Sequence, residues 1–434
     1  MCQLVLLFYF VCGSVLASIE LDIQEAVQIA LKKSPDLGQI QLLKEELYWK
    51  KWKPISGFLP HLYLGGQYVF AKAGDNLFQG PTSLQPLLAS ISLPSSYLAG
   101  IVSLNLFRGF ADVHAYGAFN LAEKAVLLEK TYAQIKIENG VKAAFYATLG
   151  TQVILDYFSE ISALLNKLSV ATEKSIHQGV KTTQALWPLY DKIRELESEK
   201  KNVQLENRRA HGELLLLMGL SKDDRKLVGF LPDLSLEQTS FSGDIHQRAD
   251  LRAKQLMVQI KNKERDASIG AMVPEINFQT SYFYYQNPLN ISETASMLNH
   301  FSVGVNFIWT VFDAGESIAK YKLASLQVNR TKNNLQQEIL KAENDFETQT
   351  ALLESLRQDE KDNDAEIKSR EKILLDIKME NKYGTSSEFD LLEAEIQIIH
   401  AKILKTKTAI TLTQEDLHMK TILGGEAHFE NDES

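Results

Sequence analysis

Two carboxylates near the end of the chain, Asp390 and Glu393, have a spacing that would let them act together. Residues three apart in an α-helix share one face, so a helix here would present both acids side by side. Such a pair attracts cations and repels anions. The ordinary alternative is a solvated helix face, which is where most paired acids lie.

The chain shows no arrangement typical of an enzyme. Its nine histidines are scattered, without a His-Glu-x-x-His pair or a close cluster. No phosphate loop, dinucleotide fingerprint or Gly-x-Ser-x-Gly elbow is present. Both cysteines, Cys2 and Cys12, fall in the segment that precedes Ala17. We therefore expect no catalysis, no cofactor and no metal site.

The segment from Met1 to Ala17 has the character of a secretory leader. It carries no charged side chain, and the apolar run Leu4–Phe10 is followed by small residues up to Ala17. This pattern predicts a signal peptide over residues 1–17, cleaved after Ala17. The apolar run is short for a transmembrane anchor. Lipidation of Cys12 is another alternative, although Val11 before it fits that processing signal poorly.

Charge and hydropathy exclude two further classes. A formal net charge of −9 argues against a general nucleic-acid-binding protein. No apolar stretch long enough to cross a bilayer as a helix follows the leader, so a transmembrane helix is not predicted. If the mature protein spans a membrane, it must do so with β-strands.

Short motifs recur in the same order in two halves of the chain, which indicates internal duplication. The pairs are Ser34–Leu37 with Arg248–Leu251, Gly57–Pro60 with Ala271–Pro274, Phe107–Gly109 with Phe312–Gly315, Gly179 with Gly384, and Gly219 with Gly424. The first two pairs share one offset and the other three share a shorter one, and an insertion in the Gly/Pro/Ser-rich segment 71–96 explains the change. The pairs predict a first repeat over residues 18–219, a linker over 220–243, a second repeat over 244–425 and a tail over 426–434.

Each repeat is expected to run helix, strand, loop, strand, long helix, turn, long helix. The strands are expected near residues 61–70, 97–107, 275–285 and 301–311. Each has about ten residues, the length that a tilted strand needs to cross a bilayer. Apolar side chains alternate with polar ones and share one face of each strand: Leu62, Leu64, Tyr68 and Phe70; Leu98, Val102, Leu104 and Leu106; Ile276, Phe278, Tyr282 and Tyr284; Phe301, Val303, Val305, Phe307 and Trp309. The strand pattern alone fits a soluble β-sandwich, with these apolar faces in its core, as well as it fits a transmembrane sheet.

The helices are predicted to be very long. They are expected over residues 109–178, 184–218, 315–382 and 386–422, with no proline between Pro94 and Pro188 and none after Pro288. Apolar residues three and four apart, such as Ile154, Tyr157, Ile161 and Leu164, predict a coiled-coil seam. A helix of roughly 70 residues extends about 100 Å, too far for a compact domain. Gly179 and Gly384 are placed where each hairpin reverses.

Four strands cannot close a transmembrane barrel, because the smallest have eight. An open sheet edge in hydrocarbon leaves backbone groups unsatisfied. The strands are therefore expected to pair with those of other copies, and three copies would supply twelve. The need for oligomerisation follows from this reasoning, whereas the number three does not.

The order of these features resembles the TolC family of outer-membrane efflux channels. Ile19–Leu37 is similar to the family's opening helix. Trp309–Gly315 resembles its strand-to-helix junction, and Tyr383–Ala394 resembles its distal hairpin. The resemblance covers nearly the whole mature chain. It implies a mainly helical α+β protein with long coiled-coil hairpins. In a trimer, these would form a twelve-helix tunnel through the periplasm, and the strands a twelve-stranded β-barrel in the outer membrane.

The resemblance also implies partners and site residues. A periplasmic adaptor, itself joined to an inner-membrane pump, would dock at the hairpin tips, and no cofactor is implied. The tips here are Gly179, Val180, Lys181 and Thr182 in the first repeat, and Tyr383, Gly384, Thr385 and Ser386 in the second. Ordinary turn chemistry explains the same glycine turns without a partner.

Asp390 and Glu393 match the family's acidic ring at the tunnel entrance, where three copies would gather six carboxylates. Glu393 stands where the family has aspartate, which keeps the charge and lengthens the reach. Ser386 stands where the family often has a basic residue that links neighbouring helices. A serine cannot form the same ionic link at this position.

The predicted function is the outer-membrane channel of a tripartite efflux or type I secretion system. The channel would be a passive conduit for substrates that the pump and adaptor deliver. Drug efflux, metal export and protein secretion use similar channels, so the substrate stays open. The alternative is a periplasmic coiled-coil scaffold with no pore, which accounts for the helices and leaves the paired amphipathic strands without a role.

Overall fold

The computed structural model describes residues 20–68, 96–180, 182–223, 225–232, 244–286 and 300–424. The predicted leader (1–17, with Cys12) and tail (426–434) lie outside the described residues, as does the second half of the predicted linker, residues 233–243. The chain divides into two compact units. The helical unit comprises Met1–Ile40, Glu129–Ala249 and Ile339–Ser434, and the sheet unit comprises Gln41–Leu128 and Asp250–Glu338. Each unit therefore takes segments from both predicted repeats.

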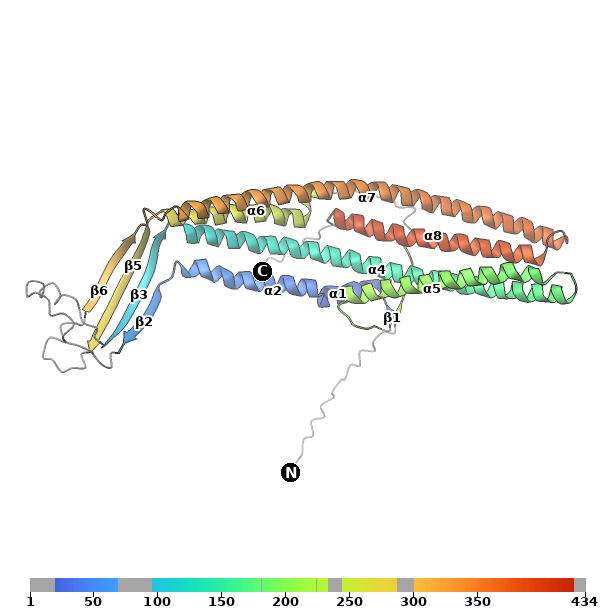
Figure 1. Cartoon of the computed structure of the whole chain (residues 1–434), viewed down its shortest axis with the longest axis horizontal. Helices are drawn as coiled ribbons and strands as arrows, with labels where there is room; N and C mark the ends of the chain where they lie inside the picture. Colours follow the sequence, from blue (N-terminus) through green and yellow to red (C-terminus); the bar gives the residue numbers. More distant parts are fainter. Residues whose placement is uncertain are drawn as a thin grey trace, which may run out of the picture. The chain divides into compact units, whose positions relative to one another are not determined.

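Most of the described residues are helical (Figure 1). The α-helices are α1 (Ile23–Lys33), α2 (Pro35–Ser56), α4 (Ala111–His177), α5 (Trp187–Leu217), α6 (Ala249–Ser268), α7 (Glu316–Lys382) and α8 (Glu388–Ile422). Single 3-10 turns are η2 (Thr183–Leu186), η3 (Ile245–Gln247) and η4 (Ile269–Met272). Both α4 and α7 have 67 residues, which corresponds to about 100 Å of helix each.

Local sequence explains where several helices begin and end. Ser34 separates α1 from α2 with a ψ of 125°, because the residue before a proline is pushed out of the helical region. Pro188 lies in the first turn of α5, where its missing N–H is tolerated. The sequence predicted this helix from residue 184, but Thr183–Leu186 form the 3-10 turn η2 instead.

The sheet unit contains one antiparallel sheet of four strands in the order β2-β3-β5-β6. The strands are β2 (His61–Gln67), β3 (Ser96–Arg108), β5 (Glu275–Gln286) and β6 (His300–Ile308). The central pair, β3 and β5, joins one strand from each half of the chain. Strands β2 and β6 are the two edges, so the sheet is open in a single copy.

Two strand details differ from the sequence prediction. Strand β6 ends at Ile308 rather than at residue 311, because its partner β5 begins at Glu275 and the preceding Pro274 has no N–H to donate. Strand β3 contains a bulge at Leu106, so that Phe107 pairs with Ile276. The end of the first predicted strand, with Phe70, lies outside the described residues.

The strand register places the apolar side chains of all four strands on one face, called here the apolar sheet face. Leu62 pairs with Val102, Leu104 with Phe278, and Phe278 with Val305. This face is open in the single chain: Leu64 is 77 % exposed and Phe301 is 67 % exposed. A soluble sandwich would cover such a face, and no described segment does so.

The opposite sheet face is polar and satisfies its own hydrogen bonds. The hydroxyls of Ser281 and Ser302 lie 2.7 Å apart, and the Asn306 amide donates to the Gln279 side chain at 2.7 Å. Ser281 is almost fully buried. Period-two alternation therefore separates an exposed apolar face from a polar face along the same strands.

The helical unit has its main apolar core where α4 meets both α5 and α8. The core residues are Ile154, Phe158, Ile161 and Leu165 of α4, Leu196 and Val203 of α5, and Ile396, Ile399 and Ile403 of α8. The predicted seam contained Tyr157 and Leu164, which are only partly buried, whereas Phe158 and Leu165 are buried. Because α4 contacts two helices at once, its apolar stripe is wider than that of a two-helix seam.

Helix α7 packs on α8 within this unit through polar pairs as well as apolar ones. The Gln349 amide donates to the Glu415 carboxylate at 2.7 Å, and the Asn363 amide donates to the Thr408 hydroxyl at 2.9 Å. Leu353 adds an apolar contact with Leu412. The α7–α8 contact is thus more polar than the seam between α4, α5 and α8.

Candidate functional site

The first hairpin tip, between α4 and α5, is a glycine turn. Gly179 has a φ of 73°, a left-handed conformation that glycine adopts without strain. The N–H groups of Gly179 and Val180 donate to the carbonyls of Ile176 and Ser175 at 2.9 Å each. These two bonds form a Schellman motif, which satisfies the last carbonyls of a helix. Val180 is 73 % exposed, Thr182 is exposed, and Lys181 lies outside the described residues.

The second hairpin tip, between α7 and α8, is built in the same way. Gly384 has a φ of 77°, and its N–H donates to the Asn381 carbonyl at 3.0 Å. The Thr385 N–H and hydroxyl both donate to the Glu380 carbonyl, at 2.9 and 3.0 Å. Tyr383 is 80 % exposed, and Ser386 is partly buried. Both tips therefore present a rigid glycine turn beside one large exposed side chain.

The structure brings the two tips to the same end of the helical unit (Figure 1). Near the tips, Leu168 of α4, Leu189 of α5 and Leu392 of α8 form one buried cluster. Because this cluster includes helices from both hairpins, the two turns are held as one surface rather than as separate loops.

Sequence reasoning missed several apolar side chains near the tips. Trp187 is 67 % exposed at the start of α5, and Tyr190, Leu375 and Met379 are also exposed. The sequence does contain a signal for the exposure of Trp187, because this residue departs from the helical periodicity of the apolar residues around it. Trp187 falls outside the stripe of Leu189, Ile193 and Leu196 that faces the core.

Asp390 has a structural role at the start of α8. Its side chain accepts from the Ser387 N–H at 2.9 Å, and the Ser387 hydroxyl accepts from the Asp390 N–H at 3.3 Å. This reciprocal pair is a capping box, which satisfies two N–H groups that a helix start leaves open. A helix N-terminus also favours a negative charge. The acid thus stabilises the turn that presents the tip.

Glu393 joins two helices. Its carboxylate lies 2.7 Å from the Lys192 amine of α5, and both side chains are partly exposed. Asp390 and Glu393 also line one hollow of about 270 Å³ between α7 and α8, together with Arg370 and Gln397. Arg370 donates to Gln397 at 2.8 Å and to Glu366 at 2.6 Å. The two acids are therefore neighbours, as their spacing predicts, and the basic residues near them were not predicted.

A second hollow of about 300 Å³ lies between α4, α5 and α8. The residues that line it include the apolar Ile161 and Leu196 and the imidazole of His400. Burial lowers the pKa of His400 below its ordinary value of 6.5, although Glu199 acts in the opposite direction. This shift favours the neutral form of the imidazole.

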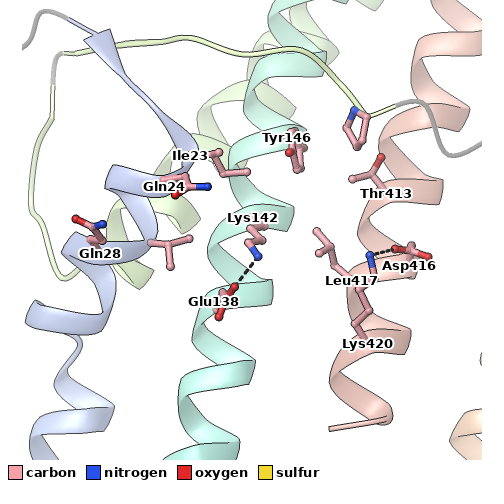
Figure 2. A pocket seen from close by; sticks show the side chains of 12 residues that line it. Ile23, Gln24, Gln28, Glu138, Lys142, Tyr146, Thr413, Asp416, Leu417 and Lys420 are labelled. Atoms are coloured by element: carbon pink, nitrogen blue, oxygen red, sulfur yellow. Dashed lines mark hydrogen bonds and ion pairs between the residues drawn. The ribbon is translucent and has the colours of Figure 1, made fainter. Parts of the chain in front are cut away.

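A third hollow, of about 470 Å³, lies between α1, α4 and α8 (Figure 2). Lys142 is 2.6 Å from Glu138 and Lys420 is 2.8 Å from Asp416, each pair along its own helix. Burial raises the pKa of the Tyr146 hydroxyl above its ordinary value. Each lysine in the hollow is thus already neutralised by an acid one turn away, and no nucleophile with an adjacent base is present among the residues that line it.

Within the described ranges, no three His, Cys, Asp or Glu side chains converge as metal ligands do.

None of the helices in the part of the chain that the structure describes has an apolar stretch able to span a membrane.

Comparisons with known proteins point to one family. Residues 245–425 match the model of the outer membrane efflux protein family. No curated protein matches the sequence. The sequence match thus falls on the second half of the chain, which contains α6, both strands β5 and β6, and the α7–α8 hairpin.

Solved structures match over nearly the whole chain. A CusC structure described for transmembrane channel formation has a TM-score of 0.77 at 17% identity, covering 94% of each chain. The Campylobacter jejuni CmeC outer membrane channel has a TM-score of 0.79 at 16% identity, covering 93% of this chain and 85% of its own. The Vibrio cholerae outer membrane protein VceC has a TM-score of 0.75 at 15% identity, covering 93% and 96%. At such identities these matches establish the fold.

The family match of the second half and the shared fold of the whole agree with each other and with the hairpin and strand features described above. Residues 245–425 of this chain match the outer membrane efflux protein family, and the chain as a whole shares the fold of solved outer membrane channels.

Proposed function

We propose that this protein is the outer-membrane channel of a tripartite efflux or type I secretion system, and that it conducts substrates passively. The observation that carries this proposal is an open four-stranded sheet whose exposed face is apolar and whose strands continue into helices of 67 residues. A sheet with a lipid-compatible outer face and a polar inner face has the pattern of a transmembrane barrel segment.

The sheet edges require further copies of the chain. In hydrocarbon, the unpaired backbone groups of β2 and β6 would cost several kcal/mol each. Pairing β2 of one copy with β6 of the next removes both edges when the ring closes. Three copies would give a twelve-stranded barrel, within the known range of such barrels.

Exposed apolar side chains on two helices of the sheet unit support the same assembly. Leu42 and Trp49 are exposed on α2, which leads into β2. Leu323 and Leu326 are exposed on α7, which follows β6. Contact between α2 of one copy and α7 of the next would bury these side chains beside the paired strand edges.

Recordings in planar bilayers test the proposal directly. The purified full-length protein is expected to form heat-modifiable oligomers and to give discrete single-channel conductances. A scaffold protein would instead be an extended, water-soluble species without conductance. That outcome would refute the channel proposal and favour the alternative, a periplasmic coiled-coil scaffold without a pore.

We assign Asp390 and Glu393 to the periplasmic entrance, where the oligomer would gather them as an acidic ring. Asp390→Asn with Glu393→Gln is expected to weaken block by polyvalent cations on the order of tenfold, about 1.4 kcal/mol, because the opposing charge is lost. Glu395→Gln is a matched control, since this acid of the same helix also lies near a cross-helix lysine, Lys378. Equal block of all three channels would exclude the two acids from the entrance.

We further propose that the two glycine turns dock the periplasmic adaptor. Gly384→Leu is expected to abolish most site-specific crosslinking to the adaptor while the oligomer still forms, because a bulky side chain stands where the partner approaches. Gly315→Leu is the control, since Gly315 also has a positive φ and open space around it but lies away from the tips. Unchanged crosslinking of the Gly384 variant would refute docking at this tip.

A further inference from the structure

The hollow between α1, α4 and α8 has the size and the mixed lining of a ligand site. Its volume is about 470 Å³, which lies within the range of small-molecule pockets in proteins. All the residues that line it belong to the helical unit. Charged, neutral polar and aliphatic side chains each occupy part of its walls, so the chemistry of a ligand can be read from their arrangement.

Two ion pairs lie on opposite walls of this hollow (Figure 2). On α4, the Lys142 amine is 2.6 Å from the Glu138 carboxylate, and on α8 the Lys420 amine is 2.8 Å from Oδ2 of Asp416. Among the described residues, no ion pair joins one of these walls to the other. Each wall thus carries both signs, and the four charges cancel. A ligand with one charge would meet as much repulsion as attraction, whereas a zwitterion can be matched at both ends.

Asp416 is the least accessible of these charged groups. Its side chain is 4 % exposed, whereas that of Lys420 is 45 % exposed. A carboxylate accepts several hydrogen bonds through its two oxygens, and within the described ranges only one amine reaches this one. Because hydrogen bonds between charged groups are stronger than neutral ones, an ammonium group that enters the hollow would gain a favourable contact here.

The α1 wall offers neutral groups that can recognise peptide bonds. The amides of Gln24 and Gln28 line the hollow and make no hydrogen bond to any described residue. A side-chain amide both donates and accepts, as a peptide group does. Residues four apart on a helix are separated by roughly 6 Å, close to the roughly 6.6 Å between every second residue of an extended chain. The two glutamines therefore match the repeat of an extended peptide.

Aliphatic side chains complete the lining. Ile23 and Val27 of α1 are partly buried, and Leu417 of α8 is buried. These side chains provide an apolar surface on which small side chains of a ligand can pack. The hollow thus combines charges for two ends, amides for a backbone and an apolar wall for side chains.

We infer that this hollow binds a short peptide with a free amino end and a free carboxyl end. The ammonium group lies beside Asp416, and the carboxylate contacts Lys142 on the opposite wall. The peptide groups bond to Gln24 and Gln28. A single amino acid would leave much of the volume unfilled and could not contact both glutamines. The proposed channel function is not needed for this site, because every group in it belongs to the helical unit.

Calorimetric titration of the purified full-length protein tests the inference. The probe is trialanine, which is charged at both ends at neutral pH. The comparison is N-acetyl-trialanine amide, which keeps the side chains and loses both charges. Trialanine is expected to bind saturably and at least tenfold more tightly than the capped peptide. No saturable binding of trialanine, or equal affinities of the two peptides, would overturn the assignment.

Substitutions in the hollow locate the bound peptide. Lys142→Met keeps the length of the side chain and removes its charge, which leaves Glu138 to repel a carboxylate. It is expected to weaken trialanine binding by about tenfold, because a charge-assisted hydrogen bond is lost. Lys405→Met is the matched control, since Lys405 is also ion-paired, with Asp364, and does not line the hollow. Equal affinities of these two variants would place the peptide elsewhere.

Gln28→Trp tests the hollow by filling it. Gln28 is exposed on α1, so the larger side chain can enter the hollow without displacing the core. Binding of trialanine is expected to be lost while the oligomer and its denaturant midpoint stay unchanged. Retained binding would refute the site. Loss of the oligomer would also overturn it and would assign the hollow to a contact between copies.

The proposed function is scored separately by single-channel conductance. Protein that conducts and does not bind trialanine would refute the peptide site and leave the channel proposal intact. Protein that binds trialanine and gives no conductance would refute the channel proposal and support the peptide site.

Discussion

Val303→Arg is expected to prevent insertion of the protein into the outer membrane. Val303 lies at mid-strand in β6 on the apolar sheet face and is 57 % exposed. An arginine on the lipid face near the bilayer midplane costs about 2–4 kcal/mol, and every copy in the oligomer would carry one. The measurement is the amount of heat-modifiable oligomer in outer-membrane fractions, which should fall to a small part of the unmodified level.

Gly304→Arg is the matched control for this prediction. Gly304 is the next residue of the same strand and faces the polar side, and a side chain added there would have open space. The variant carries the same new charge and is expected to insert almost normally. If both variants insert equally well, the apolar sheet face does not meet lipid.

Gly109→Ala is expected to destabilise the sheet unit by about 3 kcal/mol or more, from two sources that add. Gly109 has a φ of 56°, and an alanine pays about 1–2 kcal/mol for the left-handed conformation. The new methyl group would also overlap the side chain of Val273 and stand 2.7 Å from the Gly270 Cα, which is backbone and cannot yield easily. The measurement is the denaturant midpoint of the detergent-solubilised protein, followed by circular dichroism.

Gly315→Ala separates the cost of the left-handed backbone conformation from the cost of the steric overlap. Gly315 occupies the matching junction after β6, has a φ of 87° and has no atom near its added methyl group. Its substitution is expected to cost only about 1–2 kcal/mol, from the backbone conformation alone. Both changes replace glycine by alanine, so their effects on the unfolded chain largely cancel in the comparison. Equal losses would show that the close packing at Gly109 does not matter.

The regular elements could be predicted closely because they depend on local repetition. Helices α4, α7 and α8 begin and end within two residues of their expected limits. Strands β3 and β5 agree with the prediction to one residue at each end. Side chains return to the same face at each turn of a helix and at every second position of a strand, so a pattern of apolar residues identifies both the element and its buried face.

The irregular positions could not be predicted because they depend on contacts between distant segments. The bulge at Leu106 is a mismatch between β3 and β5 that neither strand reveals alone. The end of β6 is set by Pro274, which precedes its partner strand. The burial of Phe158 in place of Tyr157 follows from a third helix, α8, packing on α4.

In the candidate site, too, local features could be predicted from the sequence, whereas contacts between distant segments could not. Glycine turns at residues 179 and 384 and the proximity of Asp390 to Glu393 were evident from spacing. The partners of those acids were not evident. Lys192 is 201 residues before Glu393 in sequence, and Arg370 reaches the same hollow from α7.

The amino-acid sequence alone determined the long helices, the amphipathic strands and the turns that connect the hairpins, because each follows from periodicity and from the local backbone preferences of glycine and proline. Only the tertiary structure decided that the apolar strand residues form one continuous exposed face, that the sheet has two open edges, and that each acid near the second tip has its own structural partner. These properties arise from register and packing between segments far apart in the chain, on which no local pattern carries information.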